Sequence, residues 1–203
     1  MNDGLLFIIS APSGAGKTSL IKALINRDAS LSLSISCTTR TRREGEIDGV
    51  HYHFLDHTGF AQAVTAGAFL EHAEVFGNHY GTREADVRAY LAAGRDLILE
   101  IDWQGAQQVR TRFPTAISLF VVPPSIAELE RRLTGRGTDS AAVIAGRMAQ
   151  AHSDLTHYSE YDYIVVNDAF DAALNALAAI VNAERLRLAR QQSHLTELFG
   201  HLN

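Results

Sequence analysis

Short runs of consecutive apolar residues recur along the chain and predict buried β-strands. The first run covers residues 5–9, and similar runs occupy residues 96–101, 117–122 and 163–166. A strand that is apolar on both faces is typical of a parallel sheet that is covered by helices on either side.

Stretches with helical periodicity separate these strands. Apolar residues recur at helical spacing within residues 20–25, and further helical patterns cover residues 106–112, 126–133 and 170–189. Strands that alternate with helices predict an α/β fold, in which a parallel sheet is flanked by helices on both faces.

Residues 36–87 interrupt this alternation. They are rich in Arg, Thr, Gly, His and aromatic residues, which favours a lobe inserted over the sheet. A second polar interruption at residues 135–139 precedes a helical stretch, and we interpret this part as a mobile lid. The expected division is a core of residues 1–35, 88–134 and 158–203, a lobe of residues 36–87 and a lid of residues 135–157.

The charge balance and the cysteine count narrow the class of protein. The 203 residues include 18 Lys and Arg against 23 Asp and Glu, a formal charge of −5, which disfavours nucleic acid or an anionic membrane as a partner. Cys37 is the one cysteine, so no intrachain disulfide can form. No apolar run approaches the ~18 residues of a membrane span. We therefore expect a cytoplasmic protein, and the sequence leaves its oligomeric state open.

Two groups of polar residues are interpreted as surface features. His51 and His53 lie two positions apart in a predicted strand, and we interpret them as surface or interface residues rather than as metal ligands. The charged residues of the tail, Glu184 and Arg185 among them, are expected to form a solvated helix face within residues 183–190.

The segment between the first strand and the first helix predicts a phosphate-binding loop. Residues 11–18 read Ala-Pro-Ser-Gly-Ala-Gly-Lys-Thr, which fits the P-loop pattern except that Ala11 stands where its first Gly is expected. Glycines let backbone N–H groups approach phosphate oxygens, and the helix N-terminus adds partial positive charge. Lys17 can reach the β- and γ-phosphates, and the Thr18 hydroxyl can bind Mg²⁺. The alternative is a glycine-rich turn without a ligand. The predicted triphosphate-binding residues are Ala11, Pro12, Ser13, Gly14, Ala15, Gly16, Lys17, Thr18 and Ser19.

Two further charged groups suggest a second phosphate site and a cation site. Three arginines within residues 40–43 provide the planar donors that suit a phosphate dianion, although a solvated basic loop is the alternative. Glu100 and Asp102 end a predicted strand, where a parallel sheet places its ligand crevice. Asp102 could orient Mg²⁺ through water, or it could instead cap the helix that follows.

The order of several motifs resembles the guanylate kinase family of P-loop nucleoside monophosphate kinases. Ser-Cys-Thr-Thr-Arg-Thr-Arg-Arg-Glu-Gly-Glu occupies residues 36–46, Phe-Leu-Glu residues 69–71 and Gly-Asn-His-Tyr-Gly-Thr residues 77–82. The resemblance continues through Ile-Asp-Trp-Gln-Gly at residues 101–105 and Val-Val-Asn-Asp at residues 165–168. It covers nearly the whole chain in register, which makes the set of motifs specific.

This resemblance implies transfer of the γ-phosphoryl group of Mg²⁺-bound ATP to GMP, and to dGMP as well. The phosphate of GMP would be held by Arg40, Arg43, Tyr52 and Tyr80. The guanine base would be read by Ser36, Glu71 and Thr82, with Glu100 and Asp102 nearby. Arg132, Arg136 and Arg147 would belong to the lid, and Asn167 would line the adenine pocket. The residues expected to act in the transfer itself are Lys17, Arg40, Arg43, Arg136 and Arg147.

The chemistry of guanine agrees with the role that the resemblance gives to Glu71. A carboxylate can accept hydrogen bonds from guanine N1–H and N2–H₂ together, whereas adenine would leave it buried and unpaired. Such sites reject the analogue that lacks the donors by ~10⁴-fold or more. A surface acid at the end of a strand is the alternative for this residue.

Two residues depart from the family pattern, and two other functions are compatible with parts of the sequence. Arg42 stands where Pro is common, and His79 stands where Tyr is common. One rival is a P-loop kinase for another acceptor, and a second is a guanylate-kinase-like binding module without catalysis. Lys17 and Thr18 speak against the second rival, because such modules usually lack an intact phosphate loop.

Overall fold

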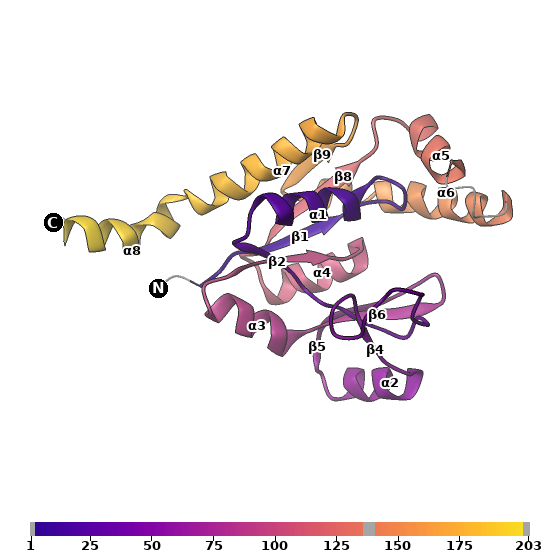
Figure 1. Ribbon diagram of the computed structural model, residues 1–203, viewed down its shortest axis with the longest axis horizontal. Helices are drawn as coiled ribbons and strands as arrows, with labels where there is room; N and C mark the ends of the chain where they lie inside the picture. The colour runs from indigo at the N-terminus through magenta and orange to yellow at the C-terminus, as the bar shows by residue number, and fades with distance from the viewer. Residues whose placement is uncertain (1–2, 136–140, 201–203) are drawn as a thin grey trace.

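A parallel sheet forms the centre of the computed structural model, which describes residues 3–135 and 141–200 (Figure 1). Within these residues its strand order is β2–β7–β1–β8–β9, and every neighbouring pair is parallel. The strands are β1 (Leu6–Ser10), β2 (Leu31–Leu33), β7 (Asp96–Glu100), β8 (Ile117–Val122) and β9 (Tyr163–Val166). The four predicted strands are confirmed within one residue at each end. The three-residue β2 was missed, because Leu-Ser-Leu is too short to form a recognisable apolar run.

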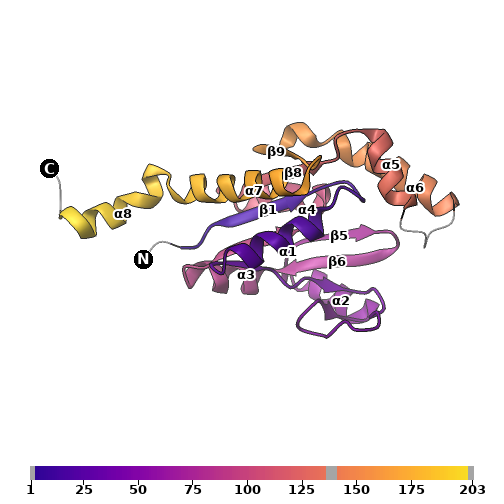
Figure 2. The same ribbon diagram turned by 45° about the horizontal axis from the view of Figure 1, so that its top comes forward.

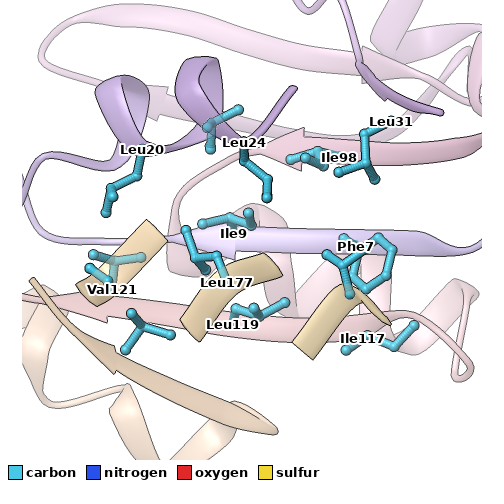
Figure 3. Packing of buried hydrophobic residues seen from close by; sticks show 14 of the residues in the cluster. Phe7, Ile9, Leu20, Leu24, Leu31, Ile98, Ile117, Leu119, Val121 and Leu177 are labelled. Atoms are coloured by element: carbon cyan, nitrogen blue, oxygen red, sulfur yellow. The ribbon is translucent and has the colours of Figure 1, made fainter. Parts of the chain in front are cut away.

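Helices cover both faces of this sheet, as its apolar strands predict. Helices α1 (Lys17–Arg27) and α7 (Phe170–Arg185) lie on one face, and α3 (Glu84–Ala92) and α4 (Trp103–Arg112) lie on the other. In β1, Phe7 and Ile9 point to the first face, where Leu24 and Leu177 pack against them (Figure 3). The alternate residues of β1 belong to the opposite cluster. Each fully buried side chain of this kind contributes about 1.5–3 kcal/mol, so the sheet rigidly fixes the loops at its carboxyl edge.

The inserted segment folds around a second sheet, described here in the order β4–β3–β6–β5. Its strands are β3 (Cys37–Thr38), β4 (His53–Phe54), β5 (Phe69–Val75) and β6 (Asn78–Arg83), and α2 (His57–Thr65) packs beside them. The hairpin of β5 and β6 lies beside the main sheet in both views (Figures 1 and 2). Its base is tied to α4, where Gln108 pairs with both backbone groups of His72 and Arg112 donates to the carbonyl of Phe69.

The predicted lid region contains a helix, as the sequence indicated. Helices α5 (Ile126–Thr134) and α6 (Ala141–Leu155) pack together through Leu129, Leu133 and Ala151. A 3₁₀ turn at Tyr158–Glu160 then leads into β9.

The end of the chain differs from expectation in two ways. The predicted helix of residues 170–189 is divided into α7 and α8 (Leu188–Phe199), and α8 extends away from the sheet (Figure 1). The prediction that Glu184 and Arg185 are solvated is wrong. Glu184 is 4% exposed and accepts a hydrogen bond from Tyr163 at 2.5 Å. Arg185 bridges Asp28 at 2.6 Å and Asp96 at 2.7 Å, so these charges anchor α7 to the edge of the sheet. No helix among the described residues is long and apolar enough to span a membrane.

Candidate active site

Two cavities meet at the carboxyl edge of the main sheet. The P-loop cavity has a volume of about 350 Å³ and is lined by residues of the loop after β1, by Asp102 and by part of α6. The lobe cavity has a volume of about 380 Å³ and is lined by the inserted sheet and the end of β7. The residues common to both walls are Ser13, Lys17, Thr18, Val75, Phe76 and Asp102. Groups bound in the two cavities would therefore lie on either side of a shared wall that contains Lys17.

The loop after β1 has the backbone conformation that phosphate binding requires. Gly14 and Gly16 have φ of 94° and 91°, a region that residues with a Cβ rarely adopt. Helix α1 begins directly after Gly16, and no side chain caps its N-terminus, so its first N–H groups remain available to an anion. All nine residues predicted to bind the triphosphate lie in this loop or at the start of α1, and all except Ala15 line the P-loop cavity.

Asn167 holds this loop in place rather than facing the P-loop cavity. Its side-chain amide donates to the carbonyl of Ala15 at 2.7 Å, and a Cβ on Gly16 would come within 2.5 Å of the same nitrogen. The carbonyl of Asn167 accepts in turn from Arg132 at 2.9 Å. The adenine-lining role that the resemblance implies for Asn167 stays a prediction, and in this structure its side chain braces the loop from just beyond the end of β9.

Two side chains of α1 reach across to the end of β7. Lys17 donates to the carbonyl of Ile101 at 3.1 Å, and the Thr18 hydroxyl donates to the Glu100 carboxylate at 2.5 Å. These bonds aim both side chains toward the boundary between the cavities. Asp102 lines both cavities and also caps α4, because it accepts from the backbone N–H of Gly105 at 2.9 Å. The capping alternative for Asp102 is therefore realised in this structure.

Glu71 is a buried acid inside the lobe cavity. It is 3% exposed, and Thr82 on the adjacent strand donates to it at 2.5 Å. The pairing of β5 with β6 shifts between Phe69 and Glu71, and such bulges re-aim side chains near functional sites. The pKa of Glu71 is raised to about 7, chiefly by burial and to a lesser extent by the charge of Asp102, while the hydrogen bonds from Thr82 oppose the shift. The alternative of a solvated surface acid is wrong.

The lack of a side chain at Gly105 makes room for this acid. A Cβ on Gly105 would lie 2.5 Å from Oε2 of Glu71, closer than real Cβ contacts come, and 3.2 Å from its Cδ. The residue belongs to the Ile-Asp-Trp-Gln-Gly motif, yet no local signal in the sequence connects it with Glu71.

Polar and aromatic side chains complete the lobe cavity. Ser36, Tyr52, Tyr80 and Glu100 line it, as predicted, and the rings of Tyr52 and Tyr80 meet edge to face at 6.1 Å. Burial raises the pKa of Tyr52, so its hydroxyl stays protonated and can donate to an anion. Thr82 is fully buried and borders the cavity only through Glu71.

The arginines of the inserted loop point elsewhere in this structure. Arg40 pairs with Glu46 at 2.7 Å, donates to the carbonyl of Thr41 at 2.8 Å and lies 5.3 Å from the Tyr52 ring centre. Glu46 also accepts from the backbone N–H of Arg43, whose side chain is exposed. The bond from Arg40 lowers the pKa of Glu46 to about 2. Neither arginine lines the lobe cavity, so a bound phosphate would have to replace Glu46 as the partner of Arg40.

Arg132 and Arg147 likewise lie outside the P-loop cavity. Arg132 pairs with Glu128 at 2.7 Å, and the guanidinium of Arg147 lies 6.0 Å from the ring centre of Phe76. Arg136 falls outside the described residues. The two departures from the family pattern avoid the lobe cavity as well. Arg42 is exposed, and His79 stacks on Phe60 at 5.4 Å within the lobe.

Several residues of the two walls were missed by the sequence reasoning. Gln150 and Asp154 reach the P-loop cavity from α6, and burial together with the charge of Asp102 raises the pKa of Asp154. His51 is exposed, as predicted, and it also lines the lobe cavity and accepts the N–H of Ile47 through Nδ1 at 3.0 Å. The other unpredicted residues are Leu33, Ser34, Ala73, Glu74, Val75, Phe76, Ile101 and Gln104. These residues reach the cavity walls because the fold brings distant segments of the chain together, and no local motif in the sequence indicates which segments meet.

The donors available for a metal are oxygen atoms. Thr18, Glu100 and Asp102 offer a hydroxyl and carboxylates near Lys17, a set that suits Mg²⁺ rather than a thiophilic ion. In the part of the chain that the structure describes, no group of three or more His, Cys, Asp or Glu could hold a metal ion alone.

Comparisons with known proteins agree over the full length of the chain. The family model for guanylate kinase matches residues 4–184. Curated guanylate kinases of Alkalilimnicola ehrlichii and Escherichia coli strain K12 are 58% and 53% identical, over 98% and 100% of this chain and over 98% and 99% of their own lengths. A crystal structure of guanylate kinase from Anaplasma phagocytophilum superposes with a TM-score of 0.78 at 29% identity, covering 99% of this chain and 98% of that one.

Proposed function

Because the chain belongs to the guanylate kinase family, we propose that ATP occupies the P-loop cavity, GMP occupies the lobe cavity and Lys17 lies on the line of transfer between them. The activity is ATP:GMP phosphotransfer, giving ADP and GDP, in purine nucleotide metabolism and GMP recycling. One observation carries the placement of the substrates: the two cavities share a wall that contains Lys17 and Thr18.

The reaction needs alignment and charge neutralisation more than covalent chemistry. An oxygen of the GMP phosphate forms a bond to the γ-phosphorus of ATP, while the bond from that phosphorus to the β–γ bridging oxygen breaks. The acceptor phosphate is already an anion near neutral pH, so no general base is required. Lys17 and the N–H groups at the start of α1 would stabilise the charge on the phosphoryl oxygens.

Guanine recognition is assigned to the buried end of the lobe cavity. Glu71 would accept from N1–H and N2–H₂ of the base, and Ser36 would lie beside it, with Glu100 near the ribose. Thr82 donates to Glu71 and thereby orients the carboxylate. A base without the two donors would leave this acid unpaired, which favours guanine over adenine, cytosine and uracil.

The phosphate of GMP is assigned to Tyr52 and Tyr80, which line the lobe cavity and carry hydroxyl donors. Arg40 and Arg43 would join them once the phosphate displaces Glu46, because a dianion competes well with a single carboxylate for a guanidinium. Acceptor binding would then rearrange the loop of residues 40–46.

Mg²⁺ and the lid complete the proposal. Thr18 would bind the ion and Asp102 would orient it through water, and the ion would neutralise charge between the β- and γ-phosphates. Arg132, Arg136 and Arg147 would approach the ATP phosphates when the lid of residues 135–157 closes over the core, and Asn167 would support the adenine side. The lobe of residues 36–87 would close from the other direction. We place this reaction in the cytoplasm, where both nucleotides are available.

A coupled ADP-release assay with GMP, dGMP, AMP, CMP and UMP tests the assignment of the lobe cavity. We expect turnover with GMP and dGMP, and at least ~10³-fold lower kcat/KM with the other nucleotides. Glu71→Ala should reduce kcat/KM for GMP and leave the KM for ATP unchanged. Equal use of AMP and GMP by the natural protein, or unchanged selectivity in the variant, would contradict the assignment.

A further inference from the structure

The tip of the β5–β6 hairpin carries an aromatic residue in an unfavourable backbone conformation. The closing pair is Val75 with Asn78, and the two turn residues Phe76 and Gly77 have φ of 50° and 73°. Hairpin turns of this kind favour Asn-Gly, because positive φ crowds a residue that has a bulky side chain. Phe76 is the one residue other than glycine that has a positive φ among the described residues.

Packing within the lobe does not account for this choice. The side chain of Phe76 is 59% exposed, and it belongs to none of the hydrophobic clusters formed by the described residues. An exposed aromatic residue in this turn lowers the stability of the folded state in two ways: its backbone is strained, and its apolar ring remains in contact with water. Strain of this sort is concentrated at functional sites.

The position of Phe76 relates it to both cavities and to the lid. Phe76 lines the P-loop cavity and the lobe cavity. The hairpin tip points toward the end of the molecule where α5 and α6 lie, in both views (Figures 1 and 2). The guanidinium of Arg147 on α6 is 6.0 Å from the ring centre, within the range of a cation–π contact. The ring thus stands where the inserted lobe, the lid helix and both cavities meet.

We propose that Phe76 is a positioning residue that closes the gap between the two cavities against water and provides the surface on which Arg147 seats the lid. The inference rests on the proposed placement of ATP and GMP. Water and the GMP phosphate compete for the same γ-phosphorus. Attack by GMP gives ADP and GDP, whereas attack by a water oxygen, with loss of its proton to solvent, gives ADP and inorganic phosphate. An apolar ring at the junction disfavours the second outcome because it occupies the volume through which water would enter.

The test compares phosphoryl transfer with hydrolysis in Phe76→Asn. Asn-Gly suits the turn, so this variant should melt at the same temperature as the natural protein or higher. With ATP and saturating GMP, we expect the ratio of inorganic phosphate to GDP to rise about 10-fold, and kcat for GDP formation to fall. Phe76→Tyr, which keeps the ring, should retain the natural ratio.

A matched control removes an aromatic side chain elsewhere. Tyr158 is 57% exposed and lines neither cavity, so Tyr158→Asn should leave the ratio unchanged. An unchanged ratio in Phe76→Asn, or a ratio raised equally by Phe76→Tyr, would overturn the proposal. A natural protein that formed no GDP from GMP would instead overturn the proposed function, so the two failures are distinguishable.

Discussion

At the scale of single residues, the raised pKa of Glu71 makes the proposed recognition of guanine by this acid depend on pH. The pKa is raised to about 7, whereas guanine requires the ionised carboxylate. Below pH 7 most molecules must therefore lose a proton before they bind GMP, and above pH 7 they need not. GMP affinity should rise with pH and level off above the pKa.

This expectation is quantitative between pH 6 and pH 8. The ionised fraction of Glu71 grows from about 0.1 to about 0.9, so GMP should bind about 10-fold more tightly at pH 8 when titrated calorimetrically. Glu71→Gln removes this dependence and keeps the contribution of the GMP phosphate itself, whose second ionisation lies near pH ~6. The same pH profile in both proteins would show that another group is responsible.

Gly105 provides a second prediction at this scale. A Cβ there would stand 2.5 Å from Oε2 of Glu71, so Gly105→Ala should displace the carboxylate from the position that guanine needs. We expect KM for GMP to rise at least ~10-fold with little change in KM for ATP, and stability to fall by about 1–3 kcal/mol. Steady-state kinetics with each substrate varied in turn measures the difference.

The matched control for this substitution is Gly146→Ala in α6. Beyond the backbone of its own helix, a Cβ on Gly146 would meet no atom of the described residues within 4 Å, and Ala is the better helix former by about 1 kcal/mol. This variant should leave KM for GMP unchanged and raise the melting temperature. If Gly105→Ala behaved in the same way, the close contact with Glu71 would have no functional meaning.

The residues of the site that could be predicted are those that belong to short contiguous motifs in the sequence. The P-loop, Ser36, Tyr52 and Tyr80 belong to contiguous motifs, and the structure brings them to the cavity walls. The partners of other residues were not predictable. Asn167 braces Ala15 from 152 positions away, and that bond depends on the order of strands in the sheet.

At the scale of elements, Arg185 is the residue that fastens α7 to the sheet. It bonds Asp28 at the end of α1, Ser30, and Asp96 at the start of β7. Asp96 is 8% exposed and also accepts the backbone N–H of Leu5. Loss of the guanidinium would leave a buried carboxylate without its counter-charge.

Arg185→Met tests this anchor. Breaking a buried ion pair costs about 3–5 kcal/mol, and because Arg185 is partly exposed we expect a loss of about 2 kcal/mol in the free energy of unfolding by urea. Arg131→Met removes an exposed i,i+3 partner of Glu128 and should leave the free energy of unfolding nearly unchanged. Equal losses in the two variants would contradict the anchoring role.

The same anchor explains why the helix pattern of residues 170–189 was misleading. Apolar periodicity continues past residue 185, and it alone predicts one helix. The chain instead leaves helical geometry at Arg187, whose ψ is 139°, directly after the residues that bind the sheet. Periodicity indicates which residues prefer burial, whereas the end of α7 also makes contacts with strands that the local pattern does not contain, 21 positions away at Tyr163 and 89 positions away at Asp96.

At the scale of the whole molecule, the sequence predicted the layers of the fold but not which residues line the boundary between the two cavities. Alternating strands and helices predict the parallel sheet, and the loss of alternation marks the inserted segment. The wall that the two cavities share could not be predicted in this way. Lys17 and Thr18 contact the end of β7, while Val75 and Phe76 of the hairpin reach the same junction. Only the folded chain brings these four residues to one wall.

This shared wall predicts that binding and transfer can be separated at Lys17. Lys17→Ala removes a charge that faces the transferred group, yet it leaves Glu71, Tyr52 and Tyr80 in place. We expect kcat to fall by at least ~10³-fold, while the affinity for GMP in the absence of ATP changes less than about 3-fold. Rapid-quench measurement of GDP formation and a direct GMP titration give the two quantities.

Lys22 supplies the comparison, because it is exposed on the same helix and lines neither cavity. Lys22→Ala should retain natural kcat and GMP affinity, which separates the position of the charge from the loss of any lysine. A parallel loss of GMP affinity in Lys17→Ala would mean that Lys17 belongs to the acceptor site rather than to the boundary. Since Lys17 lines both cavities and donates to the carbonyl of Ile101, we expect its loss to affect transfer while each substrate still binds in its own cavity.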